Sequence, residues 1–441
     1  MSDADNVRRL KYAIEGCING VWGDEPNGID DIIVVRVADF DRARGAVTLG
    51  DSPTIRAIPD SARNRRTLRS GDLLIEKSGG GEQQPVGNVV LFNDERKAVC
   101  SNFVARMAVA EECDSRFVAY SFHSLYAEGR NIPHIKQTSG IQNLDSESYF
   151  NERAWLPEKA QQVRIANFLD EQTARIDTLI AEKERLAVCV REFEQGKISE
   201  LVTYGVRVEA LRKTGNAFVP AAPCTWRVAA FKRALVDMDQ GWSPQCESRP
   251  ADSSEWGVLK VGCVNGVRFD ATENKALPSE LAPDLSCLIR KGDVLVSRAN
   301  TRELVGLAAM VDSDYPNLLL CDKLYRLKLR PDWVLPAFSI LLLRSGSVRR
   351  QVELGASGAS SSMQNISQDV IRELVVALPP LEEQQQIVIL AERIRQSCGG
   401  LRAHVAQHIS RLREYRSSLI SAAVTGQLNL DDHTHTRREV A

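Results

Sequence analysis

The segment GDLLIEK is the first candidate for chemistry, because it places Asp72, Glu76 and Lys77 on one short strand-like run. Two carboxylates and a lysine in this order could hold a divalent cation and assist phosphodiester cleavage, as in a nuclease. A second copy of the segment, GDVLVSR, retains an aspartate but has Ser297 at the position of Glu76. Metal-dependent cleavage by both copies is therefore excluded, and a structural strand is the favoured interpretation of both.

Two other motifs have simpler interpretations than a catalytic or metal site. The run GASGASSS at 355–362 resembles a phosphate-binding loop but lacks the lysine that such loops use, so a flexible loop is favoured. His404 and His408 have i, i+4 spacing and no third ligand in view, and we expect them in a core or an interface. The ten cysteines form no CxxC pair. We therefore expect no catalytic centre, no metal and no cofactor.

The composition is that of a globular protein with more than one domain. The chain has 441 residues, of which 43% are hydrophobic and 26% are charged, and its net charge is -2. No apolar run approaches the ~20 residues needed to span a bilayer, and the N-terminal residues contain no apolar signal segment. We therefore expect a cytoplasmic protein without membrane contact. Because the net charge is slightly negative, any DNA-binding surface must be local.

The chain is one unit written twice. Near the end of each half, Gln142 matches Gln364 and Pro157 matches Pro379, and the two pairs have the same offset along the chain. The GD segments match at nearly the same offset, and LKYAI near the start of the first half matches FKRAL in the second. Two copies of so long a unit cannot form a solenoid. The repeat therefore predicts a two-lobed, pseudo-symmetric protein.

Each half is predicted to contain an α+β domain followed by a long helix. Short β-rich runs alternate with turn residues and end in apolar helical stretches, which favours an antiparallel, curled sheet whose strand order stays open. The fold class is therefore two pseudo-symmetric α+β domains joined by two long antiparallel coiled-coil helices. The predicted boundaries are 1–156 for the first domain, 157–212 for the first helix, 213–221 for a linker, 222–378 for the second domain, 379–430 for the second helix and 431–441 for a disordered tail.

Both long helices carry apolar residues at heptad spacing, which predicts a coiled-coil seam. The first helix delivers the chain to the second domain, and the second helix leaves that domain near its entry point. We therefore expect antiparallel packing, with one domain at each end of a rod. The Gln-Asn pair ahead of each helix is predicted to make the turn and the cap that start it. The predicted seam residues are Ile165, Leu169, Ile176, Leu179, Leu186, Ile387, Ile394, Leu401, Val405 and Leu412.

Basic residues surround the GD segment in both halves. The run RNRRTLR precedes the first copy, and IRKGDVLVSRANTR contains the second. A charge run is usually a solvated surface, but its occurrence at the matching place in both halves favours contact with DNA phosphates and bases. The predicted DNA-contacting residues are Arg63, Arg65, Arg66, Arg69, Lys77 and Lys136 in the first half and Lys291, Arg298 and Arg302 in the second.

Together the motifs resemble the specificity subunit of type I restriction-modification systems. The resemblance rests on LPPLEEQQQIV (378–388) with its weaker copy LPEKAQQVRIANFLD (156–170), on LISAAVTGQLNL (419–430), and on PCTW at the entry to the second domain. It implies two target recognition domains that each read one half of a bipartite site in double-stranded DNA. It also implies helices that dock two methyltransferase subunits and set the half-site spacing. Restriction subunits, which are ATP-dependent translocases and nucleases, would join the same complex, and the chain itself would be non-catalytic.

Three alternatives stay open at this stage. A non-catalytic coiled-coil scaffold would bind proteins through its lobes, and salt-dependent DNA binding separates it from a DNA reader. The recognition subunit of a related restriction system would have the same architecture. A nuclease would depend on Asp72, Glu76 and Lys77 alone.

Overall fold

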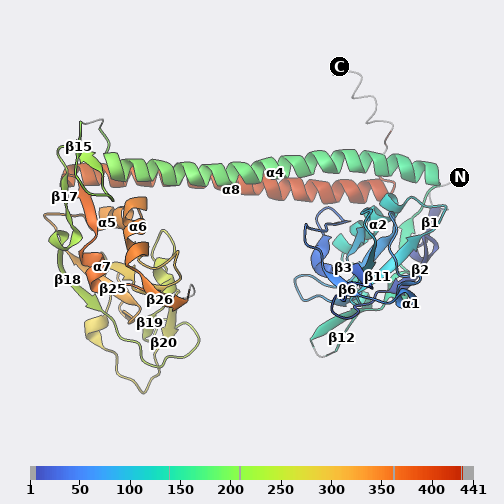
Figure 1. Ribbon diagram of the computed structural model, residues 1–441, viewed down its shortest axis with the longest axis horizontal. Coiled ribbons are helices and arrows are strands. Elements are labelled where there is room, and N and C mark those ends of the chain that lie inside the picture. The colour runs from blue at the N-terminus through green and yellow to red at the C-terminus, as the bar shows by residue number, and fades with distance from the viewer. Residues whose placement is uncertain (1–5, 139, 208–209, 361–362, 429, 431–441) are drawn as a thin grey trace. The chain divides into compact units, whose positions relative to one another are not determined.

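The computed structural model describes residues 6–138, 140–207, 210–360, 363–428 and 430, so the predicted tail 431–441 lies outside the described residues. The chain divides into two compact units (Figure 1). Unit 1 contains residues 1–185 and 405–441, and unit 2 contains residues 186–404. Each unit therefore combines one predicted domain with part of both long helices. Among the described residues, no helix is both long enough and apolar enough to cross a membrane.

The strands of unit 1 form one large sheet and several small ones. They are β1 (Val7–Arg9), β2 (Ile14–Asn19), β3 (Asp31–Val35), β4 (Phe40–Asp41), β5 (Ala46–Val47), β6 (Ile55–Ala57), β7 (Leu73–Glu76), β8 (Ser78–Gly79), β9 (Val89–Leu91), β10 (Ala98–Cys100), β11 (Val104–Val109), β12 (Ile135–Thr138), β13 (Ile141–Leu144) and β14 (Arg153–Trp155). The large sheet has the order β2-β11-β7-β9-β5-β4, and β10-β3-β6, β12-β13-β8 and β1-β14 form the others. Three helices accompany them, namely α1 (Asp60–Arg63), α2 (Ser115–Ala127) and α3 (Ser146–Tyr149).

Unit 2 contains a matching set of elements. Its strands are β15 (Leu211–Lys213), β16 (Ala221–Pro223), β17 (Arg227–Ala230), β18 (Leu235–Gln240), β19 (Gly257–Leu259), β20 (Asn274–Ala276), β21 (Val294–Ser297), β22 (Ala299–Asn300), β23 (Ala308–Met310), β24 (Leu318–Leu319), β25 (Leu324–Leu329), β26 (Ser357–Ser360), β27 (Met363–Asn365) and β28 (Val375–Leu378). Its sheets are β18-β25-β21-β23, β20-β19-β24, β22-β27-β26, β17-β28 and β15-β16. Its shorter helices are α5 (Pro336–Leu343), α6 (Gly346–Gly355) and α7 (Gln368–Arg372).

The duplication predicted from the sequence extends to the strand order. The run β2-β11-β7-β9 of unit 1 corresponds to β18-β25-β21-β23 of unit 2, and the three smaller sheets of unit 1 each have a counterpart in unit 2. The β15-β16 hairpin of unit 2, and β4 and β5 of unit 1, extend this common set. β7 begins at Leu73 and β21 begins at Val294, in each case directly after the aspartate of the GD segment. The two-lobed, mixed α+β fold class is therefore confirmed.

The GD segments close the same turn in both units. Gly71 has a φ angle of +93°, which L side chains rarely adopt. The carboxylate of Asp72 accepts a hydrogen bond at 2.6 Å from the guanidinium of Arg106 on the neighbouring strand β11. At the matching place in unit 2, the carboxylate of Asp293 lies 3.6 Å from Arg326 on β25. The segment recurs because it ties the central strand of each large sheet to its neighbour.

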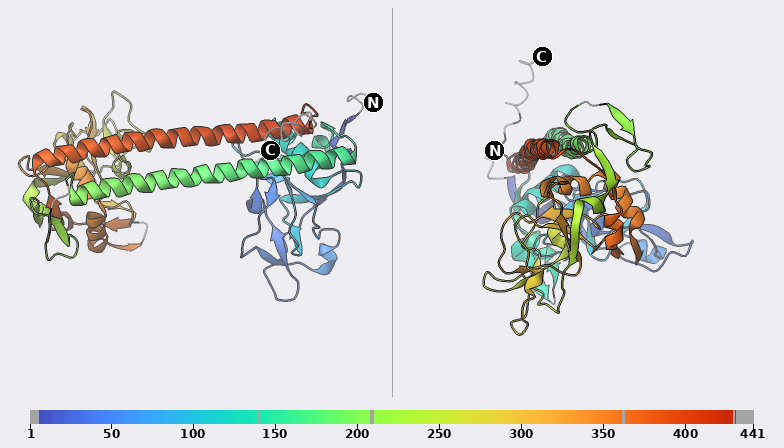
Figure 2. Two further views of the ribbon diagram at one scale, coloured as in Figure 1. Left: turned by 90° about the horizontal axis from the view of Figure 1, so that it is seen from above. Right: turned by 90° about the vertical axis from the view of Figure 1, so that its left-hand side faces the viewer.

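Two long helices, α4 (Lys159–Tyr204) and α8 (Leu381–Val424), each contribute to both units (Figure 2). In unit 1, the carboxylate of Asp177 lies 3.0 Å from Arg416, and that of Glu184 lies 3.1 Å from Arg413. Residue numbers rise along α4 where they fall along α8. The helices are therefore antiparallel, as predicted.

Both long helices are shorter than the predicted 157–212 and 379–430. α4 ends before Gly205, which has a φ angle of +82°, and α8 ends before Gly426, which has a φ angle of +75°. A glycine in the left-handed region turns the chain so that the following main-chain N–H groups donate to the last carbonyl groups of the helix, and the helix ends there. Beyond α4, the residues predicted as helix end and linker (213–221) contribute to the β15–β16 hairpin instead.

Most of the predicted seam residues are buried or half-buried, but three leucines are exposed. Those that are buried or half-buried are Ile165, Leu169, Ile176, Ile387, Ile394, Val405 and Leu412. Leu179, Leu186 and Leu401 are instead 44%, 40% and 45% exposed, so their placement on the seam is wrong. In each case the residue that follows the leucine is half-buried in its place on the seam. These residues are Ile180, Ala187 and Arg402.

The shift to the next residue follows from charged side chains on the seam. Arg416 is only 7% exposed and lies against Asp177 in unit 1, and Arg402 forms an ion pair with Glu194 in unit 2. A buried arginine is tolerated only where a carboxylate faces it, so these pairs decide which face of each helix turns inward. Heptad counting that starts from apolar residues does not detect them.

A buried glutamine fastens the start of each long helix to its domain. The amide of Gln162 donates to the carbonyl of Pro157 at 2.7 Å and accepts from the N–H of Asp114, the N-cap of α2, at 2.9 Å. In unit 2, Gln384 accepts from the N–H of Leu335, the N-cap residue of α5, at 2.8 Å. Both glutamines are almost completely buried. This interaction explains why Leu-Pro, followed at the same short distance by a glutamine, occurs in both halves.

We expect Gln384→Ala to lower the free energy of unfolding of unit 2 by roughly 2–3 kcal/mol, because it leaves the N–H of Leu335 without its acceptor. Urea unfolding followed by tryptophan fluorescence measures this loss. The neighbouring Gln385→Ala is the matched control, because Gln385 is exposed, and its effect should stay within about 0.5 kcal/mol. Equal losses in the two variants would contradict the fastening role of Gln384.

Candidate nucleic-acid interface

Two arginines of the first basic run are fastened to unit 1. The side chain of Arg63 is 17% exposed and lies 3.5 Å from the carboxylates of both Asp30 and Asp60. Arg66 donates from Nε to the carbonyl of Asn19 at 3.1 Å. These contacts hold the loop before β7 against the end of β2, and they occupy hydrogen-bond donors that would otherwise be available to DNA.

The other two arginines of the run are available. Arg65 and Arg69 are exposed, and within the described part of the chain their side chains make no hydrogen bond or ion pair. Arg65 has a φ angle of +64°, and its carbonyl accepts a hydrogen bond from Arg106 at 3.1 Å. A side chain held in the left-handed region costs of order 1 kcal/mol. The surrounding structure therefore maintains a turn that presents Arg65 to solvent.

A cation and an amide meet at the end of the central strand in both units. Just after β7, Lys77 donates from Nζ to the side-chain oxygen of Asn19 at 2.9 Å. Just after β21, Arg298 donates to the carbonyl of Asp322 at 3.3 Å, and Gln240 donates to the same carbonyl at 3.2 Å. Asn19 and Gln240 end the matching strands β2 and β18 and are related by the offset of the GD segments. Sequence reasoning missed both amides, although the repeat offset could have paired them.

The remaining cations of unit 2 are less closely grouped. Lys291 precedes β21 and is exposed, and its main-chain N–H donates to a carboxylate oxygen of Asp314 at 3.1 Å. Arg302 follows β22 and is exposed, and its carbonyl accepts from Arg349 at 3.4 Å. The structure therefore places Arg298 and Arg302 beyond one end of β21 and Lys291 before the other.

The Gln-Asn pairs lie in strands and not at the starts of the long helices. Gln142-Asn143 belongs to β13, which pairs with β12 and β8. Gln364-Asn365 belongs to β27, which pairs with β26 and β22. The prediction that they cap the long helices is wrong, because a short helix capped by Asp145 or Ser367 and a strand follow each pair.

The first of these hairpins carries Lys136. This residue lies on β12, is 75% exposed and has its ammonium 2.7 Å from the carboxylate of Asp145. The hydrogen bond from Lys136 is the main cause that lowers the pKa of Asp145. The β12 hairpin projects from the side of unit 1 that faces away from α4 (Figure 1). A two-stranded ribbon of this kind has the dimensions that the major groove of B-DNA admits.

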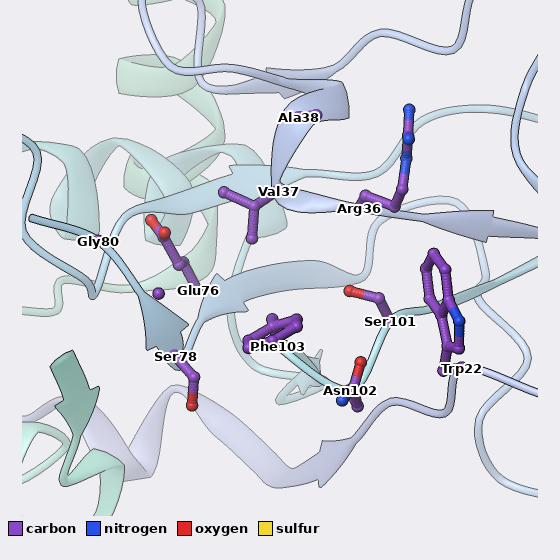
Figure 3. A pocket seen from close by; sticks show the side chains of 11 residues that line it. Trp22, Arg36, Val37, Ala38, Glu76, Ser78, Gly80, Ser101, Asn102 and Phe103 are labelled. Carbon is purple, nitrogen blue, oxygen red and sulfur yellow. The ribbon is translucent and has the colours of Figure 1, made fainter. Parts of the chain in front are cut away.

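A cavity of about 490 Å³ lies in unit 1 beside the end of β7. Figure 3 shows Trp22 and Glu76 on opposite sides of it, with Phe103 between them. Glu76 is 1% exposed, and its carboxylate lies 2.6 Å from Arg42. Burial raises the pKa of Glu76 more than Arg42 lowers it. The walls of the cavity are mostly apolar, and Asn102 adds a polar group.

The carboxylates that could have formed a nuclease site are neutralised by arginines. Asp72 is bound by Arg106, and Glu76 is bound by Arg42. In the part of the chain that the structure describes, no group of three or more acidic, histidine or cysteine side chains is placed to hold a metal ion. The arrangement supports binding of phosphates and bases at the strand ends better than metal-dependent cleavage.

Comparison with known proteins identifies the relatives of the chain. Residues 259–399 match the type I restriction modification DNA specificity domain. The EcoEI specificity subunit of Escherichia coli is 31% identical over 184 residues, and the EcoKI specificity subunit of Escherichia coli strain K12 is 26% identical over 318 residues. Over these segments the chain is similar to type I restriction enzyme specificity subunits. The resemblance inferred from its motifs is thereby confirmed.

The extent of these similarities differs between sequence and fold. The matches cover 42% and 71% of this chain, but 31% and 66% of the EcoEI and EcoKI specificity subunits, which is less than two thirds of each. A chain from a structure of the type I R-M system has a TM-score of 0.71 at 17% identity and covers 96% of this chain and 98% of its own length. The HsdS subunit of Thermoanaerobacter tengcongensis has a TM-score of 0.50, also at 17% identity, with 96% and 97% covered. At this level of identity the structural similarities show a shared fold.

We expect the double variant Arg65→Ala, Arg69→Ala to reduce the slope of log K for duplex DNA against log salt concentration by up to about 1.8, since each phosphate contact contributes about 0.9. Fluorescence anisotropy of a labelled duplex in a salt series measures the slope. Arg96→Ala is the matched control, because Arg96 belongs to the same unit but is paired with Asp94 at 2.6 Å. An unchanged slope in the double variant would contradict the assignment of these arginines.

Proposed function

We propose that the chain is the DNA-recognition subunit of a type I restriction-modification assembly. The α+β domain of unit 1 reads one half of a bipartite site in double-stranded DNA, and that of unit 2 reads the other half. The helices α4 and α8 dock two methyltransferase subunits and set the spacing between the half-sites. Restriction subunits join through the same complex, and the chain itself catalyses no reaction.

One observation carries this proposal, namely that the two units share the strand order of their sheets but differ in the side chains at the ends of the strands. At corresponding positions, Lys77 of unit 1 faces Asn19, whereas Arg298 of unit 2 shares an acceptor with Gln240. Lys136 on β12 corresponds to a glycine on β26. Two copies of one framework with different exposed groups suit two different half-sites, in the way that dimeric readers place two heads on one duplex.

The helices offer equivalent surfaces to two copies of one partner. Unit 1 exposes Leu179 and Tyr415 by 44% and 58%, and unit 2 exposes Leu401 and Phe193 by 45% and 58%. Leu401 is the repeat of Leu179, and Tyr415 is the repeat of Phe193, at the offset that relates the two Gln-Asn pairs. Apolar side chains outside the seam of a helix pair are the kind of surface that a further helix covers. Two equivalent pairs therefore support docking of two methyltransferase subunits.

We expect selection from a randomised duplex pool to enrich a bipartite sequence, and each unit to control one half of it. Lys77→Ala should relax the preference in one half only, and Arg298→Ala should relax it in the other half, since the two residues occupy equivalent positions in different units. Each lost specific contact should cost about 1–3 kcal/mol against its base pair. Sequencing of the bound pool gives the preference at every position.

Each variant is the control for the other in this selection. A change in both halves with either variant would contradict independent reading by the two units. If binding to all sequences is equally weak and no sequence is enriched, the chain is a scaffold that does not read DNA.

We expect the pair of substitutions Leu401→Asp and Phe193→Asp to remove one methyltransferase copy from the complex, because the charges cannot be covered by an apolar helix surface. The pair Leu179→Asp and Tyr415→Asp should remove the other copy. Native mass spectrometry of the chain with its methyltransferase measures the stoichiometry, which should fall from two copies to one in either case. Retention of two copies in both variants would contradict these docking surfaces.

A further inference from the structure

The cavity beside β7 has the size and the lining of a binding site, although none of the contacts described above uses it. Its volume of about 490 Å³ is far more than one water molecule occupies. An apolar cavity with a few convergent polar groups and a carboxyl of raised pKa is the usual character of a ligand site. Its place at the strand end of Lys77 puts it next to the cations that we assign to DNA.

We propose that this cavity receives one nucleobase with an exocyclic amino group, swung out of the duplex half-site that unit 1 reads. The inference rests on the proposed function, because the base comes from the DNA bound by the same unit. Recognition of an extruded base would add to the base contacts made at the strand ends. A base removed from the stack is recognised by its whole hydrogen-bonding edge and by both of its faces.

The side chains that line the cavity match such a base. Trp22 and Phe103 supply aromatic surfaces, and stacking on such surfaces stabilises an unstacked base. The carboxylate of Glu76 belongs to the cavity lining, where it accepts hydrogen bonds from Arg42 and from the main-chain N–H of Gly80 and keeps acceptor capacity for a further donor. An acceptor in this position favours the amino groups of adenine, cytosine or guanine. Thymine has no exocyclic amino group and offers only its ring N3–H as a donor, so it is less favoured.

The backbone joins the cavity to Lys77 at the end of β7. The main-chain N–H groups of Lys77 and Ser78 donate to the carbonyl of Phe103 at 2.8 Å and 3.2 Å. Lys77, which we assign to DNA contact, is therefore fixed next to the aromatic wall. Gly79 and Gly80 form one edge of the cavity, and the cation Arg36 belongs to its lining.

Unit 2 does not repeat the cavity lining, although it repeats the framework around it. Ser297 takes the position of Glu76, and Ser243 takes that of Trp22. The carbonyl that accepts from the residue after the central strand belongs to Phe103 in unit 1 and to Lys323 in unit 2. The aromatic walls and the carboxylate are therefore absent at the equivalent positions. We assign extrusion of a base to unit 1 alone.

The test uses the duplex enriched by selection and removes, one position at a time, the base opposite each base of the half-site. A protein that reads a stacked pair loses affinity when the pair is broken. A protein that extrudes a base binds more tightly when the base opposite it is removed, because no base pair then has to be broken. For the full-length chain we expect a gain of about tenfold or more at one position in the half-site of unit 1, and none in the half-site of unit 2.

Two variants connect that gain to the cavity. Phe103→Ala should reduce the gain to less than about threefold, and because Phe103 is 45% exposed the variant should fold normally. Glu76→Gln should retain the gain but relax the preference for the extruded base. Tyr12→Ala is the matched control, since Tyr12 is an exposed aromatic of the same unit away from the cavity lining, and it should behave as the unchanged protein.

The outcomes separate this inference from the proposed function. If selection enriches no duplex, both fail. If a duplex is enriched but every partner removal weakens binding, reading of half-sites stands and base extrusion is overturned. A thermal midpoint that rises by several degrees with free adenosine, cytidine or guanosine would overturn the DNA source and assign the cavity to a free nucleoside. A gain that persists undiminished in Phe103→Ala would overturn the role of the cavity.

Discussion

Each unit depends on one buried glutamine at the junction between its domain and a long helix. An amide can donate and accept at once, so Gln162 satisfies the carbonyl of Pro157 and the N–H of Asp114 together. An apolar residue could fill the same space but would leave both main-chain groups unsatisfied in the interior. Packing of Ile165 and Leu169 into the core of unit 1 completes the junction. These contacts fix the direction in which the domain leaves the helix. They therefore also fix the direction in which the strand ends of that domain point.

The framework and the exposed groups obey different physical constraints. Inside each large sheet, an aspartate directly before the central strand must face an arginine on the neighbouring strand, and this pairing recurs as Asp72 with Arg106 and Asp293 with Arg326. A change there would leave a charge in the interior without its partner. At the strand ends, Lys77 and Arg298 are partly exposed to water, and a substitution costs the fold little. The same architecture can therefore present different groups without loss of stability.

The features that were predicted from the sequence are those that produce a periodic or repeated sequence pattern. The duplication, the GD segments and the two long helices each appear twice at a nearly constant offset. The seam was displaced to the next residue at several positions, because Arg416 and Arg402 pair across it and charged residues do not enter a hydrophobic pattern. The Gln-Asn pairs were placed on the wrong element, because a strand and a short helix lie between them and the long helix.

The candidate site was predictable only where charge clusters along the chain. Arg65 and Arg69 were found for that reason, but Arg63 turned out to be held by Asp30 from another segment and by Asp60 of its own helix α1. Trp22, Glu76 and Phe103 come from three separate loops and strand ends, and nothing in their sequence separation brings them together. Such a cavity exists only once the sheet has formed, so its lining leaves no local pattern.

The arginine at position 416 also restricts how the two long helices can slide along each other. In the observed register, its guanidinium meets Asp177 at 3.0 Å. A displacement of α8 by a fraction of a heptad would carry Arg416 away from that carboxylate and leave a buried cation without its partner, which costs several kcal/mol. A displacement by a full heptad, about 10 Å along the axis, would instead bring Arg416 level with Asp170 or Glu184. Within unit 1 this pairing therefore restricts the axial setting of the helix pair to steps of one heptad, and a length change in either helix would have to be matched in the other.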